Sequence, residues 1–248
     1  MNFKPHPSGL AVPEPHVSTS QAGGLKLPEK KRFDVAVFPL VNEVLFPGVS
    51  LPIQIFEARY DRMLQDVQAR GWPLAVSLVV PHSRTEFVLN TICGAGPIQV
   101  SKSYEDGRSD ILVHGKQRVK LRSFLQKEPY FVMEAESLDV EECSISSSSQ
   151  MASEQRALQG FLALMKTWAF VNAEVPREIG IAFESFGTMG ELSDFFVFHF
   201  IKKAQDKQVY LNCTDPTERA EMLARYLETD LIRLTKKISK NQRAMLLH

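Results

Sequence analysis

The residues that could carry out chemistry are few, and the glycine-rich signals among them are incomplete. A phosphate-binding loop needs G-x-x-x-x-G-K followed by Ser or Thr. The Gly-Lys pair that begins at Gly115 lacks the following Ser or Thr and has Asp110 in the place of the first glycine. A serine nucleophile on a sharp turn needs G-x-S-x-G, and the segment from Gly48 to Pro52 ends in the wrong residue. The sequence therefore predicts neither a P-loop nor this type of hydrolase.

The histidines and cysteines show no metal-binding or redox spacing. Neither H-E-x-x-H nor C-x-x-C occurs in the chain. Three scattered cysteines, Cys93, Cys143 and Cys213, are typical of free thiols in a reducing compartment. The chain has no apolar run of about 18 residues, and its N-terminus shows no secretory signal. We therefore expect a cytoplasmic protein without a membrane span, a metal ion or another cofactor.

The charge balance disfavours a protein built on the neutralisation of phosphates. The 248 residues include 29 Lys and Arg and 29 Asp and Glu, so the formal net charge is zero. A local basic patch is compatible with a neutral total, but nucleic acid is not the partner that this composition indicates. A chain of this length holds one large domain or two small ones, with an ample core.

One apolar run, from Phe38 to Gly48, organises the first half of the chain. It contains Pro39 and Pro47 near its two ends. Proline fixes φ and lacks an N–H, so we expect that neither end continues a regular ladder. We interpret the run as a strand end, a buried turn and the approach to a second strand, Leu51–Phe56. The surrounding strands would cover this apolar corner.

Changes in composition predict four parts. Residues 1–31 are rich in Pro, Ser, Gly and Ala and lack periodicity, which indicates a disordered tail. Residues 32–140 show short strand patterns, residues 141–150 form an acidic and then serine-rich linker, and residues 151–245 carry helical stripes. The second part would hold about six or seven short strands and one helix, which suggests a compact β-barrel.

Local signals place the turns and helix ends within this plan. Gly71 is expected to end the one helix of the barrel, and Asp106-Gly107 predicts a two-residue hairpin turn. Gly96-Pro97 predicts a bend in a strand. In the last part, Asp215 has the position of an N-cap, followed by proline and by glutamate three residues on.

Three blocks of the chain, which begin at Phe38, Gly94 and Glu191, carry patterns that resemble the N-terminal, substrate-binding domain of the Lon protease family. In the first block, FPLVNEVLFPGVSLPIQIFEARYDRML, the matching residues are Pro39, Leu40, Phe46, Pro47, Gly48 and Arg59. In the second, GAGPIQVSKSYEDGRSDILVHGKQRVKLRSF, they are Gly94, Ile98, Val113, Gly115, Arg118 and Val119. In the third, between Glu191 and Leu231, they are Leu192, Asp194, Leu211, Asp215 and Arg219. The resemblance extends over about residues 33–235.

The resemblance implies an α+β fold in which a PUA-like β-barrel is followed by a C-terminal helical bundle. It also implies a domain that binds polypeptide without catalysis of its own, because the ATPase and the serine–lysine protease of the family lie in separate domains. The expected partners are unfolded or apolar polypeptide segments, and an ATP-dependent protease or a chaperone that receives them. We expect the groove between barrel and bundle to bind them through Leu45, Phe46, Pro47 and Phe196.

Two alternatives stay open at this stage. Barrels of the PUA type bind RNA in other proteins, so an RNA-binding module is the second hypothesis. The zero net charge and the lack of an aromatic and basic motif count against it. Gly115 and Arg118 are either part of a site or structural, with a backbone that needs glycine and an arginine held by carbonyls or a carboxylate. We favour the structural interpretation.

Overall fold

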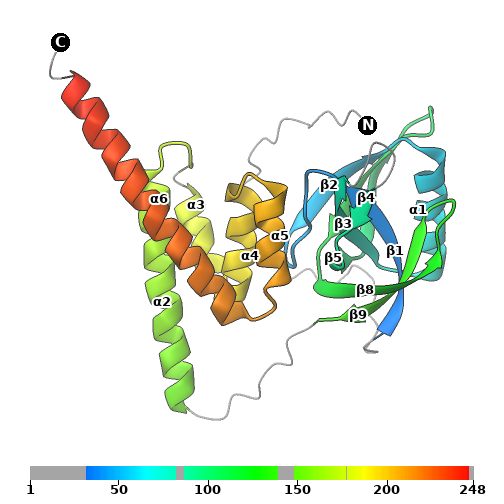
Figure 1. Cartoon of the computed structure of the whole chain (residues 1–248), viewed down its shortest axis with the longest axis horizontal. Coiled ribbons are helices and arrows are strands. Elements are labelled where there is room, and N and C mark those ends of the chain that lie inside the picture. Colours follow the sequence, from blue (N-terminus) through cyan, green and yellow to red (C-terminus); the bar gives the residue numbers. More distant parts are fainter. Residues whose placement is uncertain (1–31, 82–86, 139–147, 177, 246–248) are drawn as a thin grey trace. The chain divides into compact units, whose positions relative to one another are not determined.

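The computed structural model describes residues 32–81, 87–138, 148–176 and 178–245 (Figure 1). The predicted tail, residues 1–31, lies outside this part, and so do residues 141–147 of the predicted linker. The described residues have an α+β fold, in which a five-stranded barrel with additional strands is followed by a helical C-terminal region. The predicted fold class is confirmed.

The first part of the chain contains short strands and one helix, α1 (Ala58–Arg70). The strands are β1 (Arg32–Leu40), β2 (Ser50–Ile55), β3 (Leu74–Pro81), β4 (Phe87–Leu89), β5 (Ile92–Gly96), β6 (Ile98–Ser103), β7 (Ser109–His114), β8 (Gln117–Gln126) and β9 (Phe131–Ser137). Their number exceeds the predicted six or seven because the chain breaks at Asn90-Thr91 and again at Pro97.

The barrel closes through one parallel pair of strands. The order β1-β9-β8-β5-β3 is antiparallel throughout, and β1 then pairs with β3 in parallel. A parallel pair needs a crossover connection, which β2 and α1 supply here. The strands β2, β7 and β6 form a separate three-stranded antiparallel sheet. The chain leaves the barrel and enters this sheet at Gly96-Pro97, where the sequence predicted a bend.

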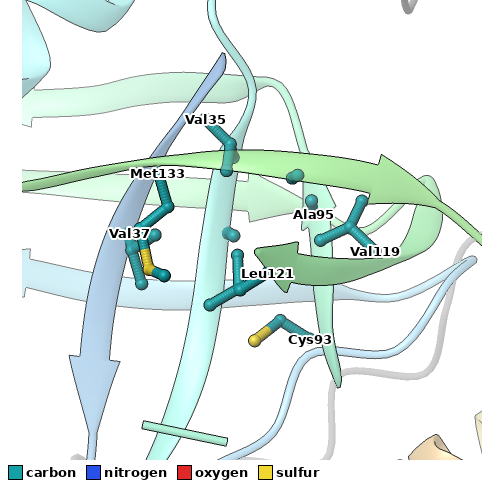
Figure 2. Close-up of a cluster of buried hydrophobic side chains, with 9 residues drawn as sticks. Val35, Val37, Cys93, Ala95, Val119, Leu121 and Met133 are labelled. Atoms are coloured by element: carbon teal, nitrogen blue, oxygen red, sulfur yellow. The ribbon is translucent and has the colours of Figure 1, made fainter. Parts of the chain in front are cut away.

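Small and branched side chains from the barrel strands fill the barrel interior (Figure 2). The buried cluster consists of Val35, Val37, Ala75, Cys93, Ala95, Val119, Leu121, Met133 and Ala135. Cys93 is fully enclosed, and this burial raises the pKa of its thiol to about 12. The thiol therefore stays protonated at neutral pH and acts as a small apolar group.

The first proline of the apolar run lies inside a ladder, contrary to expectation. β1 continues through Pro39 to Leu40, and Pro39 is the register partner of Ser77 on β3. On its other side β1 has already lost its neighbour, because pairing with β9 ends at Val37. A residue with a neighbouring strand on one side only can lack an N–H without breaking a ladder bond. Pro47 lies in a turn, as predicted.

The hairpin between β6 and β7 is longer than predicted. Five residues, Tyr104 to Arg108, separate the two strands, and the Tyr104 N–H donates to the carbonyl oxygen of Arg108 over 2.9 Å. Gly107 has a φ of 85°, which a residue with a side chain rarely adopts. The α1 helix ends as predicted, at Gly71 in the left-handed conformation with a φ of 65°.

The buried corner at Leu45 and Phe46 packs directly against two glycines of the barrel. A Cβ atom on Gly94 would lie 2.1 Å from the carbonyl oxygen of Leu45, and one on Gly115 would lie 2.0 Å from that of Phe46. Gly115 does not have a positive φ, because among the described glycines only Gly48, Gly71 and Gly107 have one. Gly115 is required because the corner approaches its backbone too closely for a side chain.

Replacing this glycine with the smallest side chain should therefore destabilise the protein. We expect Gly115→Ala to lower the free energy of unfolding by about 1–3 kcal/mol, the usual cost of overpacking. Gly160→Ala is the matched control, since a Cβ there meets nothing within 4 Å and lies in an exposed helix. The control should leave stability unchanged or raise it by up to about 1 kcal/mol. Urea unfolding of both variants measures the difference, and equal stability would contradict the close approach.

The C-terminal region is helical apart from short connections. Its elements are α2 (Ser148–Val171), α3 (Glu178–Ala182), the 3-10 turn η1 (Phe183–Ser185), α4 (Met189–Phe200), α5 (Ala204–Asn212) and α6 (Pro216–Met245). α5 was not among the expected helices. The apolar stripe of α2 is buried as predicted, and its Trp168 indole N–H donates to Asp230 on α6 over 2.9 Å.

The chain forms two compact units, each of which combines segments that are far apart in the sequence. The barrel unit contains the strands, α1 and the stretch from Ser193 to Arg219. The helical unit contains α2, α3, η1 and the start of α4 up to Leu192, together with α6 from Ala220 onward. α5 and most of α4 therefore group with the barrel and not with the other helices.

Candidate functional site

Three residues from separate blocks of the sequence meet in a buried ionic cluster of the barrel unit. The guanidinium of Arg118 on β8 donates to both carboxylate oxygens of Asp194 on α4, over 2.9 and 2.7 Å. Arg219 on α6 approaches the same carboxylate, with its Nε 2.9 Å from Oδ1. Each of the three side chains is less than a tenth exposed.

Each of the two arginines also donates a hydrogen bond to a backbone carbonyl. Arg118 Nε donates to the carbonyl oxygen of Leu211 over 3.1 Å, and Arg219 Nη1 donates to that of Cys213 over 2.7 Å. Burial lowers the pKa of Arg219 from its usual value, and the Asp194 carboxylate opposes this effect. The cluster therefore ties β8 to α4 and to the segment after α5. The Arg118 guanidinium is held by a carboxylate and a carbonyl, which is the arrangement that the structural interpretation expects.

The predicted cap of α6 brings Arg219 to this cluster. The Asp215 carboxylate accepts from the backbone N–H groups of Thr217 and Glu218, over 2.8 and 3.2 Å. These are donors that a helix leaves unpaired in its first turn. Because the helix starts here, Arg219 follows one turn later and reaches Asp194. The four residues Arg118, Asp194, Asp215 and Arg219 thus form one structural unit.

The side chains expected to contact a polypeptide are mostly inaccessible. Leu45, Phe46 and Phe196 are each 0% exposed, so no partner can reach them in this conformation. Pro47 is half-buried. The interpretation of these residues as a binding surface is corrected by their burial: an apolar turn that packs against Gly94 and Gly115 belongs to the core. The expected groove between barrel and bundle stays a prediction.

Other motif residues also have structural surroundings. Leu40 ends β1, and Gly48 has a φ of 79° in the turn before β2, where its N–H donates to the carbonyl oxygen of Gly115 over 2.9 Å. Arg59 is exposed, pairs with Glu57 over 2.8 Å and lies over the ring of Tyr60. The partners of Arg59 lie at the same helix start.

A different part of the barrel unit exposes large apolar side chains. Phe124 and Leu125 near the end of β8 are 45% and 53% exposed, and Val88 on β4 is 55% exposed. Val80 on β3, the cross-strand partner of Val88, is exposed as well. The half-buried Phe131 meets Phe124 edge to face at 5.7 Å and also packs against the interior cluster. Adjacent exposed apolar side chains of this size are a typical feature of binding surfaces.

Two bulges explain why neighbouring residues of β8 are both exposed. The register between β8 and β9 shifts between Leu121 and Phe124 and again between Phe124 and Gln126. A bulge inserts an extra residue, bends the strand and re-aims side chains. In a regular strand with one face buried, Phe124 and Leu125 would point to opposite faces and one would be covered. The sequence signal was the adjacent pair Phe-Leu, which breaks the alternation at the strand end.

The exposed residues lie beyond the point where two barrel strands separate. β5 and β8 pair from Ala95–Gln117 to Ile92–Lys120, and the last bond runs from the Leu121 N–H to the carbonyl oxygen of Thr91. Beyond it, β4 follows β3 while β8 follows β9. Among the described residues, β4 and the end of β8 have no pairing with each other. We call these two edges, Phe87–Leu89 and Arg122–Gln126, the open seam.

The described residues offer no alternative in the form of a metal centre or a membrane span. No group of three or more His, Cys, Asp or Glu side chains that could hold a metal ion occurs in this part of the chain. None of its helices is long and apolar enough to cross a membrane. The exposed apolar side chains of the open seam make it the candidate site.

Comparison with known families places the chain. Residues 34–229 match the model of the ATP-dependent protease La (LON) substrate-binding domain. The chain belongs to this Lon family. The Lon protease of Escherichia coli K12 is 26% identical over 218 residues, which is 85% of this chain and 27% of the relative. The Lon protease of Cytophaga hutchinsonii is 24% identical over 198 residues, 79% of this chain and 24% of the relative.

Solved structures of Lon domains share the fold. The N-terminal domain of the Mycobacterium avium complex Lon protease has a TM-score of 0.61 at 15% identity, and the match covers 79% of this chain and 98% of that domain. The Lon N-terminal domain protein from Xanthomonas campestris has a TM-score of 0.55 at 16% identity, over 78% and 98%. The chain spans about a quarter of the length of the curated Lon proteases it matches, and the matched part is the substrate-binding domain.

In this Lon domain, the residues that carried the resemblance differ in role from the residues at the open seam. Those that carried the resemblance, such as Arg118, Asp194 and Gly115, hold the fold of the Lon domain together. Those at the open seam, such as Phe124 and Leu125, are exposed. Resemblance in sequence thus identifies the domain, while exposure identifies the surface it offers.

Proposed function

We propose that this chain is a Lon-type substrate-binding domain that binds apolar polypeptide segments and has no catalytic activity of its own. The family assignment supports the class of function. The observation that carries the binding is the exposure of Phe124, Leu125 and Val88 at the open seam. Fully covering a side chain of this size contributes about 1.5–3 kcal/mol, so a few such contacts suffice for weak, sequence-tolerant binding.

The partners follow from this chemistry. An unfolded chain exposes apolar segments that a folded protein covers, and the open seam offers apolar side chains in return. A domain that holds such a segment serves an ATP-dependent protease or a chaperone that acts on it. The purified chain should neither hydrolyse ATP nor degrade casein, since its sequence lacks a phosphate-binding loop.

Removing the apolar side chains at the seam should weaken the binding of polypeptide. We expect the double variant Phe124→Ser/Leu125→Ser to bind a labelled unfolded peptide at least about tenfold more weakly, a loss of about 1.4 kcal/mol. Phe56→Ser is the matched control, because Phe56 is equally exposed but follows β2 in the other sheet. Fluorescence anisotropy measures the affinities. Equal binding by the double variant and the wild type would place the site elsewhere.

A salt series separates apolar binding from RNA binding. The affinity for the peptide should change little between about 50 and 300 mM salt, because apolar burial is hardly screened. Binding of a labelled RNA would weaken steeply over the same range, through counterion release. Tight, salt-sensitive RNA binding without a peptide signal would contradict the proposed function.

A further inference from the structure

The open seam has a feature that exposed side chains alone do not provide, namely unpaired backbone. β8 is paired on both sides as far as Lys120, with β5 on one side and β9 on the other. From Arg122 to Gln126 the described structure pairs it with β9 alone, and at two positions only, Phe124–Met133 and Gln126–Val132. An edge of this kind presents a row of N–H and C=O groups that can accept another strand.

The edge of β8 is guarded only in part, by its two bulges and by the exposed Arg122. Folded proteins protect free edges with charged side chains, proline, β-bulges or very short strands. β6 is such a case, since it forms the edge of the second sheet and its exposed residues are Gln99, Ser101, Lys102 and Ser103. β8 instead carries exposed Phe124 and Leu125 at its edge. The exposed side chains of β6 are thus all polar, whereas those of the β8 edge include two large apolar ones.

The basic residues around the β8 edge favour a polypeptide segment with acidic residues at its ends. The segment from Lys120 to Glu128 contains three basic residues and one acidic residue. Lys127 lies 5.2 Å from the ring centroid of Phe124, next to the apolar pair. Arg122 is paired with Glu136 on β9, so Lys120 and Lys127 are the basic residues toward the two ends of the edge that remain for a partner. An extended apolar segment with a carboxylate at either end therefore matches the edge in both side chains and charge.

We propose that an extended apolar polypeptide binds this Lon domain by adding a strand to the free edge of β8 between Arg122 and Gln126. The inference rests on the proposed function and specifies how the segment is held. Backbone hydrogen bonds provide affinity that does not depend on sequence, while Phe124 and Leu125 select apolar side chains. β5 runs antiparallel to β8, and its pairing with β8 ends at Ile92. The added strand would continue this ladder and would therefore also run antiparallel to β8.

The test compares peptides with the same side chains and different backbones. The probe is a blocked peptide, Glu-Val-Thr-Val-Ser-Val-Thr-Val-Glu, with a fluorescent label. Two analogues carry N-methyl groups at the even or at the odd central positions, which removes the N–H donors of one edge of the strand at a time. Strand addition predicts that at least one analogue binds tenfold or more weakly than the unmodified peptide.

Hydrogen exchange locates the added strand on the protein. The amides of residues 122–126 should exchange more slowly in the presence of the unmodified peptide. Those of β6, residues 98–103, serve as the control edge and should not change. Protection at β6, or none at residues 122–126, would overturn the proposed site.

The outcomes distinguish this inference from the function on which it rests. If all three peptides bind with equal affinity, the segment is held by side chains alone; strand addition is then wrong and the proposed function stands. If the unmodified peptide does not bind at all, both the function and the inference fail. A selective loss for one or both analogues, together with protection at residues 122–126, supports strand addition.

Discussion

Replacing Asp194 with alanine should lower the free energy of unfolding of the barrel unit by about 3–5 kcal/mol, the usual cost of leaving a buried charge without its partner. Asp194 is the one carboxylate that the described structure places between Arg118 and Arg219. Both arginines are buried, and their remaining contacts are carbonyl oxygens, which cannot neutralise them. Alanine would leave two cations facing each other at low dielectric.

Two variants control for this effect. Arg219→Met keeps a pair of one arginine and one carboxylate, so it should cost less than Asp194→Ala. Glu221→Ala breaks an exposed ion pair with Arg225 at 3.8 Å and should change stability by less than about 1 kcal/mol. Urea unfolding followed by the fluorescence of Trp72, in a background where Trp168 is replaced by Phe, reports on the barrel unit. Equal stability of Asp194→Ala and Glu221→Ala would show that the cluster does not hold the unit together.

Features set by neighbouring residues were predictable from the sequence. Asp215 caps its helix and Gly71 ends α1, because each acts on backbone groups within a few positions. The apolar stripe of α2 is buried, since a helical repeat carries its own pattern. Arg118 has the kind of partners that the structural interpretation expects, although its partner Asp194, 76 positions away, could not be derived from residue patterns without an alignment.

Features that depend on distant partners were missed. α5 shows no clear amphipathic pattern because two of its polar residues, Lys207 and Gln208, are buried. Lys207 pairs with Glu43 over 2.6 Å, and Gln208 donates to the carbonyl oxygen of Ile92 over 2.9 Å. These partners lie more than 100 positions away. The open seam was missed for a similar reason, since the sequence does not show where two strands stop pairing.

The sequence predicted two roles for the apolar corner, a buried turn and a contact surface for polypeptide, and the structure was needed to decide between them. Phe46 follows a turn-like segment and is apolar, which is compatible with a core residue and with an exposed contact residue. The close approach of its carbonyl oxygen to Gly115 decides between them. The sequence shows both residues but not that the chain brings them together.

Phe46→Ala should therefore lower the free energy of unfolding by about 3–5 kcal/mol, the usual cost of truncating a buried aromatic side chain. The side chain is fully buried, and its ring centroid lies 5.9 Å from the Arg118 guanidinium. Truncation would remove apolar contacts and leave a cavity beside the ionic cluster, which the surrounding barrel can fill only in part. Urea unfolding in the Trp72 background measures the change.

Phe124→Ala is the matched control, because it removes the same side chain from the exposed end of β8. An exposed substitution of this kind should change stability by only about 0.5 kcal/mol while weakening peptide binding. The two phenylalanines should thus show opposite behaviour, with Phe46→Ala unstable but able to bind peptide when folded. If Phe46→Ala keeps full stability and loses peptide binding, Phe46 belongs to the binding surface, and the corner must open to expose it.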